Sequence, residues 1–113
     1  MEKEIILNIA TNSCTPGYKL AELMEQNKDD VNIIKAVAKN TNTPGYVLRN
    51  IIQCTSDSGI LIDIINNPSS PPLALREFIS KSDDMSVLLA ISKKSNIPGL
   101  VLTELFKKIE ELK

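Results

Sequence analysis

Apolar residues recur along this chain at fixed distances from four prolines. The intervals are 28, 27 and 27 residues between Pro16, Pro44, Pro71 and Pro98. Apolar side chains lie four, seven and eight residues after the prolines: Leu20, Leu23 and Met24; Leu48, Ile51 and Ile52; Leu75, Phe78 and Ile79; Leu102, Leu105 and Phe106. Because an α-helix has about 3.6 residues per turn, these positions share one side of a helix. The pattern predicts an amphipathic helix of about three turns after each proline.

A second apolar run precedes each proline. Its members lie eleven, ten and seven residues upstream: Ile5, Ile6 and Ile9; Ile33, Ile34 and Val37; Ile60, Leu61 and Ile64; Val87, Leu88 and Ile91. Isoleucine and valine also suit strands, but steps of three and four with alanines between them favour a helix over alternating strand positions. Each proline is therefore expected to join two helices.

The stretch NTNTPGYVL, residues 40–48, predicts the corner between those helices. Proline fits the first helical position, and Thr15, Thr43 or Ser70 just before it is expected to cap the helix N-terminus. In the last unit Ile97 takes that place, which leaves Asn96 as an alternative cap. The upstream helix is expected to stop at Asn12, Asn40 and Asn67 in the left-handed conformation that asparagine tolerates, and its start carries Glu2, Asp30, Asp57 and Asp84 at the positive end of the helix dipole.

A period of 27 or 28 residues is typical of stacked supersecondary units. The sequence predicts one all-α domain over residues 1–113, with four helix-turn-helix repeats at about 1–28, 29–55, 56–82 and 83–113. Charged segments at both ends, MEKE and FKKIEELK, are expected to close the array and prevent indefinite stacking.

The corner segments AKNTNTPGYVL, IATNSCTPGYKL and INNPSSPPLAL resemble the leucine-rich repeat variant family and, more broadly, HEAT-like helical repeats. The resemblance covers essentially the whole chain and implies a right-handed superhelix (solenoid) with binding surfaces on the outer helix faces. Two features depart from it. These units leave room for two ordinary helices, and they are shorter than the roughly 40 to 47 residues of HEAT and armadillo repeats. The iron-sulfur cluster known in the family belongs to a separate cysteine-rich segment without a counterpart here, so no cofactor is expected.

Composition narrows the functional classes. The 113 residues carry 13 basic and 14 acidic side chains, a net charge of -1 that provides no general attraction to nucleic acid or anionic membranes. The sequence contains no histidine and no glycine-rich phosphate loop, so we expect no enzymatic activity. Cys14 and Cys54 are expected to be buried or half-buried free thiols rather than a disulfide or metal ligands. Without an apolar span or a leader-like segment, a cytoplasmic location is expected.

A row of outward positions on the second helices is the candidate partner-binding surface. Tyrosine and arginine are enriched where proteins bind partners. The candidate residues are Tyr18, Tyr46, Arg49, Gln53, Leu73 and Arg76. The alternative is that the arginines only form solvated ion pairs with Glu22, Glu77 or Glu104.

The leading hypothesis is thus a protein-interaction or scaffold module. A helical-repeat protein that binds nucleic acid is one alternative, disfavoured because the basic residues are interleaved with acidic ones. A structural homo-oligomer is another, formed through Leu7, Ile62 and Leu89 on the first helices. The aspartates at residues 29–30, 57 and 83–84 suggest a cation site as an alternative to helix caps. Helix capping suits them better, because calcium needs six to eight oxygens.

Overall fold

The computed structural model describes residues 1–95 and 97–113, with the side chain of residue 73 also outside the description. These residues form eight α-helices and one 3-10 turn and contain no strand, so the expected all-α class is confirmed. The elements are α1 (Glu2–Thr11), α2 (Gly17–Gln26), α3 (Val31–Lys39), α4 (Gly45–Cys54), α5 (Ser58–Asn66), η1 (Pro72–Ala74), α6 (Leu75–Lys81), α7 (Met85–Lys93) and α8 (Gly99–Glu111).

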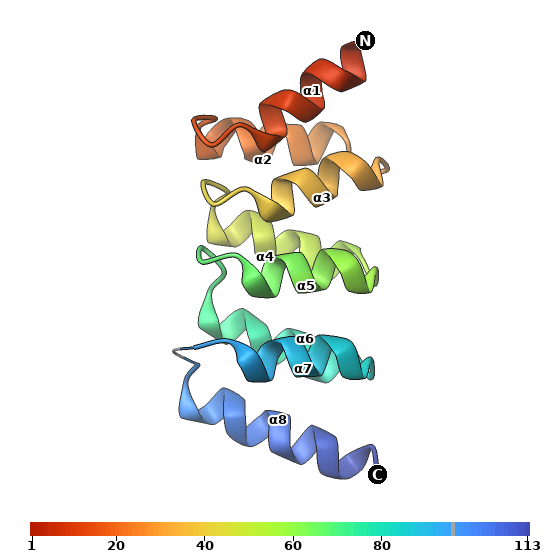
Figure 1. Cartoon of the computed structure of the whole chain (residues 1–113), viewed down its shortest axis with the longest axis vertical. Helices are drawn as coiled ribbons and strands as arrows, with labels where there is room; N and C mark the ends of the chain where they lie inside the picture. Colours follow the sequence, from red (N-terminus) through yellow and green to blue (C-terminus); the bar gives the residue numbers. More distant parts are fainter. Residues whose placement is uncertain (96) are drawn as a thin grey trace.

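The helices pack in sequence along an elongated body of 48 × 23 × 18 Å. We number the helix pairs along the chain: α1 with α2, α3 with α4, α5 with α6, and α7 with α8. The first helices of the pairs pack on one another in the order α1, α3, α5, α7, and the two ends of the chain lie at opposite ends of the long axis (Figure 1). A position in one pair therefore lies beside its equivalent in the next.

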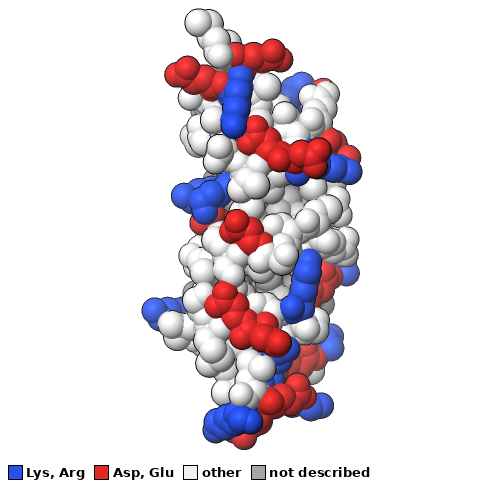
Figure 2. Space-filling model, turned by 90° about the vertical axis from the view of Figure 1, so that its right-hand side faces the viewer, with Lys and Arg blue, Asp and Glu red and all other residues white. Residues whose placement is uncertain are grey.

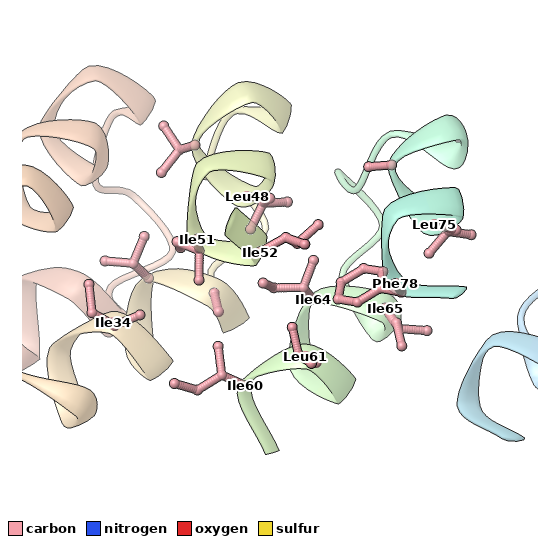
Figure 3. Close-up of a cluster of buried hydrophobic side chains, with 14 of the residues drawn as sticks. Ile34, Leu48, Ile51, Ile52, Ile60, Leu61, Ile64, Ile65, Leu75 and Phe78 are labelled. Atoms are coloured by element: carbon pink, nitrogen blue, oxygen red, sulfur yellow. The ribbon is translucent and has the colours of Figure 1, made fainter. Parts of the chain in front are cut away.

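The core runs between the pairs as the apolar spacing predicts. Leu48 and Ile52 of α4 point toward Ile64 and Phe78 of the third pair, whereas Ile51 points toward Ile34 of α3 (Figure 3). None of Leu48, Ile51, Ile52, Ile64 and Phe78 is more than 1% exposed. The predicted apolar stripes of α2, α4 and α6 are buried, as are those of α3, α5 and α7.

The prediction fails at the two outermost helices. Leu102 and Phe106 of α8 are 46% and 67% exposed, and Val101 is buried in their place along with Leu105. On α1, Ile5 and Ile9 are 54% and 38% exposed. The reason is that these positions face the neighbouring pair, and no further pair lies beyond α1 or α8 in the described residues. Most of the charged residues expected at both ends are exposed, but apolar side chains are exposed beside them.

The corner differs from the predicted capping. Pro16, Pro44 and Pro98 are themselves the N-cap residues, with an extended backbone and a carbonyl that accepts the first helical hydrogen bonds. Thr15 and Thr43 do not cap. Their hydroxyls turn backward and donate to carbonyls of the preceding helix: Ile9 at 2.6 Å and Val37 at 2.7 Å. Ser70 Oγ is buried and makes no hydrogen bond within the described structure, and Asn96 lies outside the described residues.

The asparagines do end the first helices, but not in the left-handed conformation. Asn12, Asn40 and Asn67 are extended, with φ of -72°, -74° and -77°. Asn40 Nδ2 donates to the carbonyls of Ala10 and Asn12 at 2.8 and 2.9 Å. Asn67 Nδ2 repeats this one pair further along, on the carbonyls of Ala38 and Asn40 at 2.8 and 3.0 Å.

The asparagine side chain therefore supplies donors for carbonyls at the end of the preceding pair's helix, which have no intrahelical partner. Its own Oδ1 meanwhile accepts from a backbone N–H two residues on, at 2.9 Å for both Asn40 and Asn67. One residue thus stops a helix, shapes its corner and joins two pairs.

Glycine permits close packing at the same corners. A Cβ on Gly17 would lie 3.0 Å from Cγ of Pro44, and one on Gly45 would lie 2.9 Å from Cγ of Pro71. Both distances are too short for an ordinary contact with the rigid proline ring of the next pair. Gly17 and Gly45 therefore let successive corners approach.

We predict that Leu48→Ala destabilises the fold by roughly 2 to 5 kcal/mol, because it leaves a cavity between the second and third pairs. The equivalent substitution Leu102→Ala, at a half-exposed site, is expected to cost less than about 1 kcal/mol. Urea denaturation of both variants measures the difference. Equal losses would show that the two leucines have the same environment, contrary to the structure.

We predict that Asn67→Ala lowers the free energy of unfolding by about 2 kcal/mol or more, because the buried carbonyl of Ala38 loses its donor and that of Asn40 retains only Thr43 N. The matched control is Asn12→Ala, since Asn12 Nδ2 has no carbonyl of a preceding pair to bind in the described structure. Thermal unfolding should separate the two variants clearly. If both are equally mild, the bridging bonds contribute little.

Candidate functional site

Two tyrosines project from the start of the second helices. Tyr18 on α2 and Tyr46 on α4 are 73% and 62% exposed. Each is the second residue of its helix, directly after the glycine at the corner. The corner thus holds the start of each helix, and the rings extend from a fixed base into solvent.

Arginines on this face form ion pairs from one helix to the next. Arg49 Nε on α4 lies 2.7 Å from Glu77 Oε1 on α6. Arg76 on α6 is bidentate to Glu104 on α8, with Nε 3.0 Å from Oε2 and Nη2 2.6 Å from Oε1. The hydrogen bond that Arg76 donates to Glu104, together with the negative charge of Glu104, raises the pKa of the Arg76 guanidinium above its ordinary value.

These pairs add little to stability because all four side chains are at least 30% exposed and water screens them. They do fix where each guanidinium lies. The interpretation of the arginines as partners of Glu77 and Glu104 is confirmed, whereas Glu22 pairs with Lys19 of its own helix at 2.6 Å.

An open groove of about 780 Å³ crosses α4, α6 and α8 around these ion pairs. Tyr46 and Gly45 line one side at the start of α4, and Pro71, Ala74 and Ser80 contribute the surface of the third pair. Both ion pairs lie along it. The groove therefore combines an aromatic side chain, two guanidinium groups and two carboxylates. They come from α4, α6 and α8, the second helices of three successive pairs.

The structure brings together three of the six predicted binding residues, namely Tyr46, Arg49 and Arg76. Tyr18 and Gln53 are exposed but do not line the groove. The side chain of Leu73 lies outside the described residues. Glu77 and Glu104 line the groove but are not in the predicted set. The sequence does contain a signal for them, because each lies six residues after its proline and the arginines lie five residues after theirs.

The three residues considered for self-association have different environments. Leu7 and Ile62 are half-buried and pack against the core, whereas Leu89 is 55% exposed on α7. They therefore do not present one continuous exposed row in this chain.

The aspartates at the start of the first helices act as caps. Asp30 Oδ1 accepts from Asn32 N and Ile33 N, Asp57 Oδ1 accepts from Ile60 N, and Asp84 Oδ1 accepts from Ser86 N. Among the described residues no three Cys, Asp or Glu side chains are grouped in a way that would hold a metal ion. Figure 2 shows acidic side chains recurring along the edge formed by these turns, with Lys and Arg between them, so neither sign covers this edge continuously.

Cys14 and Cys54 are free, but the expectation that they are buried or half-buried is wrong, because both are exposed. They lie in different helix pairs. No helix within the described ranges is both long and apolar enough to cross a bilayer. Comparison of the chain with protein-family models, curated proteins and solved structures finds no match. The resemblance to helical-repeat families therefore rests on the corner motif and its spacing alone.

We predict that Asp84 makes the stability acid-sensitive. Hydrogen bonds from Ser58 Oγ and from Ser86 lower the pKa of the Asp84 carboxyl from 3.8 to about 2. A lowered folded-state pKa means that the unfolded chain binds the proton more readily. This contribution is therefore present above pH 3.8 and is lost as the pH falls through about 2.

The measurement is the urea midpoint between about pH 5 and pH 2 for the wild type, Asp84→Asn and Asp29→Asn. Asp84→Asn should be less stable at neutral pH and show a flatter acid profile. Asp29 is exposed and caps no helix, so its variant should follow the wild type. Parallel profiles for all three proteins would exclude Asp84 as a source of the acid sensitivity.

Proposed function

We propose that the chain is a protein-interaction or scaffold module, a right-handed solenoid of four helix-turn-helix repeats that binds a protein partner in the groove across α4, α6 and α8. The repeated corner contacts of Asn40 and Asn67 support the repeat classification. The observation that carries the binding proposal is the groove itself, where Tyr46 and two oriented arginines meet in the middle of the array.

The mechanism is presentation of a preorganised surface. The groove residues come from helices whose opposite faces are buried in the core, and the ion pairs already hold both guanidinium groups. A partner that lies along the long axis would contact successive helices with little loss of conformational entropy on this side, which favours binding. Exposed aromatic and arginine side chains are also where binding energy concentrates.

A protein partner suits this groove better than nucleic acid. Both groove arginines already share their charge with a glutamate, and the chain as a whole has a net charge of -1. Binding to phosphates would need those guanidinium groups free, because affinity for nucleic acid depends on neutralising phosphate charge. A partner with mixed polar and aromatic groups has no such requirement.

We predict that Tyr46→Ala combined with Arg49→Glu abolishes partner binding without unfolding the protein. Both side chains are largely exposed, so the melting temperature should be nearly unchanged. Loss of a true hot spot weakens binding by about thirtyfold or more, equivalent to about 2 kcal/mol. The measurement is titration calorimetry with the partner recovered by affinity capture on the wild-type chain.

Two control variants make the result specific. Tyr18→Ala removes an equally exposed tyrosine at the equivalent position outside the groove, and it should bind as the wild type does. Arg49→Glu with Glu77→Arg keeps an ion pair between α4 and α6 in reversed order, so it separates the role in packing from the role in binding. Full affinity in the Tyr46 and Arg49 double variant would place the partner surface elsewhere.

A further inference from the structure

The fourth pair exposes an apolar surface that includes two positions of α8 buried in every other pair. We call it the tail face, defined by Met85 and Leu89 of α7 and by Leu102 and Phe106 of α8, which line one shallow depression. Leu102 is 46% exposed, whereas its equivalents Leu20, Leu48 and Leu75 are fully buried. Phe106 is 67% exposed, whereas its equivalents Met24, Ile52 and Ile79 do not exceed 4%. In the other three pairs the following pair covers these positions.

The first pair shows the complementary surface. We call it the head face, defined by Ile5, Ile9 and Asn12. Ile5 is 54% exposed, against at most 2% for its equivalents Ile33, Ile60 and Val87. Ile9 is 38% exposed, against full burial for its equivalents Val37, Ile64 and Ile91. In the later pairs the preceding pair covers these positions.

The polar and steric features of the joints inside the chain are also present at the two ends. Asn12 has the side-chain amide that, in Asn40 and Asn67, donates to two carbonyls of the preceding pair. The equivalent carbonyls at the other end of the chain belong to Ser92 and Lys94. Gly99 has the same place at its corner as Gly17 and Gly45, but a Cβ there would meet no described atom within 4 Å. Pro44 and Pro71 lie against Gly17 and Gly45. Their equivalent in the first pair is Pro16.

We propose that the head face binds the tail face of a second copy of this chain, so that two copies stack as consecutive helix pairs do within one. In this arrangement Ile5 and Ile9 cover Leu102 and Phe106, Asn12 Nδ2 donates to the carbonyls of Ser92 and Lys94, and Pro16 packs on Gly99. The occupant is a second copy because the chain itself carries the matching half of each of these contacts.

The residues at the proposed joint that are equivalent to two internal ion pairs do not repel each other. Inside the chain, ion pairs join Lys35 to Asp63 and Arg49 to Glu77. At the proposed joint the equivalent positions are Leu89 opposite Asn8 and Thr103 opposite Glu22, so no like charges meet there. The contact is mainly apolar, and salt should weaken it little.

The two faces lie at opposite ends of the long axis (Figure 1), so the contact is heterologous and leaves a head and a tail free for further copies. A tail-to-tail dimer would bury Phe106 but would leave the head face exposed and Gly99 without a proline. The joint uses surfaces other than the groove, so it stands or falls independently of the proposed partner binding.

The first test is sedimentation equilibrium of the wild-type chain over a concentration series up to about 1 mM. The weight-average mass should rise above the 12.5 kDa of one chain as concentration increases. A weight-average mass equal to that of one chain at every concentration would overturn the proposal. The head and tail faces would then contact another partner or solvent.

Two double variants then identify the faces. Leu102→Glu with Phe106→Glu removes the tail face, and Ile5→Glu with Ile9→Glu removes the head face. Each should be a folded monomer alone, with association weakened by about tenfold or more. Mixed together they should form one-to-one dimers, because one retains an intact head and the other an intact tail. A head variant that still dimerises alone, or a mixture that stays monomeric, would contradict the head-to-tail joint.

Gly99→Leu tests the geometry without adding charge. A side chain at residue 99 has open space in a single chain, so the variant should have the melting temperature of the wild type. The new leucine side chain should occupy the position where Pro16 of the second copy packs, and so weaken association. The matched control is Leu100→Glu, which removes an exposed leucine of α8 outside the tail face and should associate normally. Normal association of Gly99→Leu, or equal loss in Leu100→Glu, would refute the proposed contact.

Discussion

The hydrogen bonds that Asn40 and Asn67 donate to the preceding pair are the contacts on which the arrangement of helix pairs depends. The last carbonyls of a helix have no intrahelical partner, and leaving them buried without a donor is costly. Asn40 and Asn67 supply that donor from the following pair, and Lys94 donates to Ile65 O at 2.9 Å where the fourth pair has no asparagine. A helix end in one pair is therefore completed only when the next pair is in place. Local helix termination and stacking between pairs become one requirement.

This coupling also fixes the register of the surface. Hydrogen bonds join each corner to the next, and glycine–proline contacts join the first three, so a residue on one second helix lies beside its equivalent or an adjacent position on the next. The ion pairs of Arg49 with Glu77 and of Arg76 with Glu104 follow from that register. They stabilise the fold little, but they define the charge pattern of the groove, and the hydrogen-bonded corners behind them keep the pattern constant.

The same coupling makes the two ends chemically unlike the middle. A pair inside the array has a neighbouring pair on both sides. In contrast, the Asn12 amide of the first pair donates to no carbonyl of another pair among the described residues, and Leu102 and Phe106 of the last pair are exposed. Ends of stacked arrays are normally made polar to prevent association. Here charged residues are present near the ends but do not cover the apolar positions, so the end faces keep the chemistry of an internal joint.

The sequence by itself determined the helices and most of the core, since the spacing of apolar residues around Pro16, Pro44 and Pro71 is a local property that one helix can express. It did not determine every helix start, because the prolines lie just before the helices and α6 begins only at Leu75. It also indicated Tyr46, Arg49 and Arg76 as neighbours, because a regular period aligns equivalent positions. Tertiary structure alone decided the roles of Thr43 and Asn40, whose side chains bind carbonyls of the preceding helix and the preceding pair rather than their own helix starts. It likewise decided the exposure of Leu102 and Ile5. A side chain's spacing shows which face it belongs to, but only the presence of a neighbouring pair determines whether that face is buried.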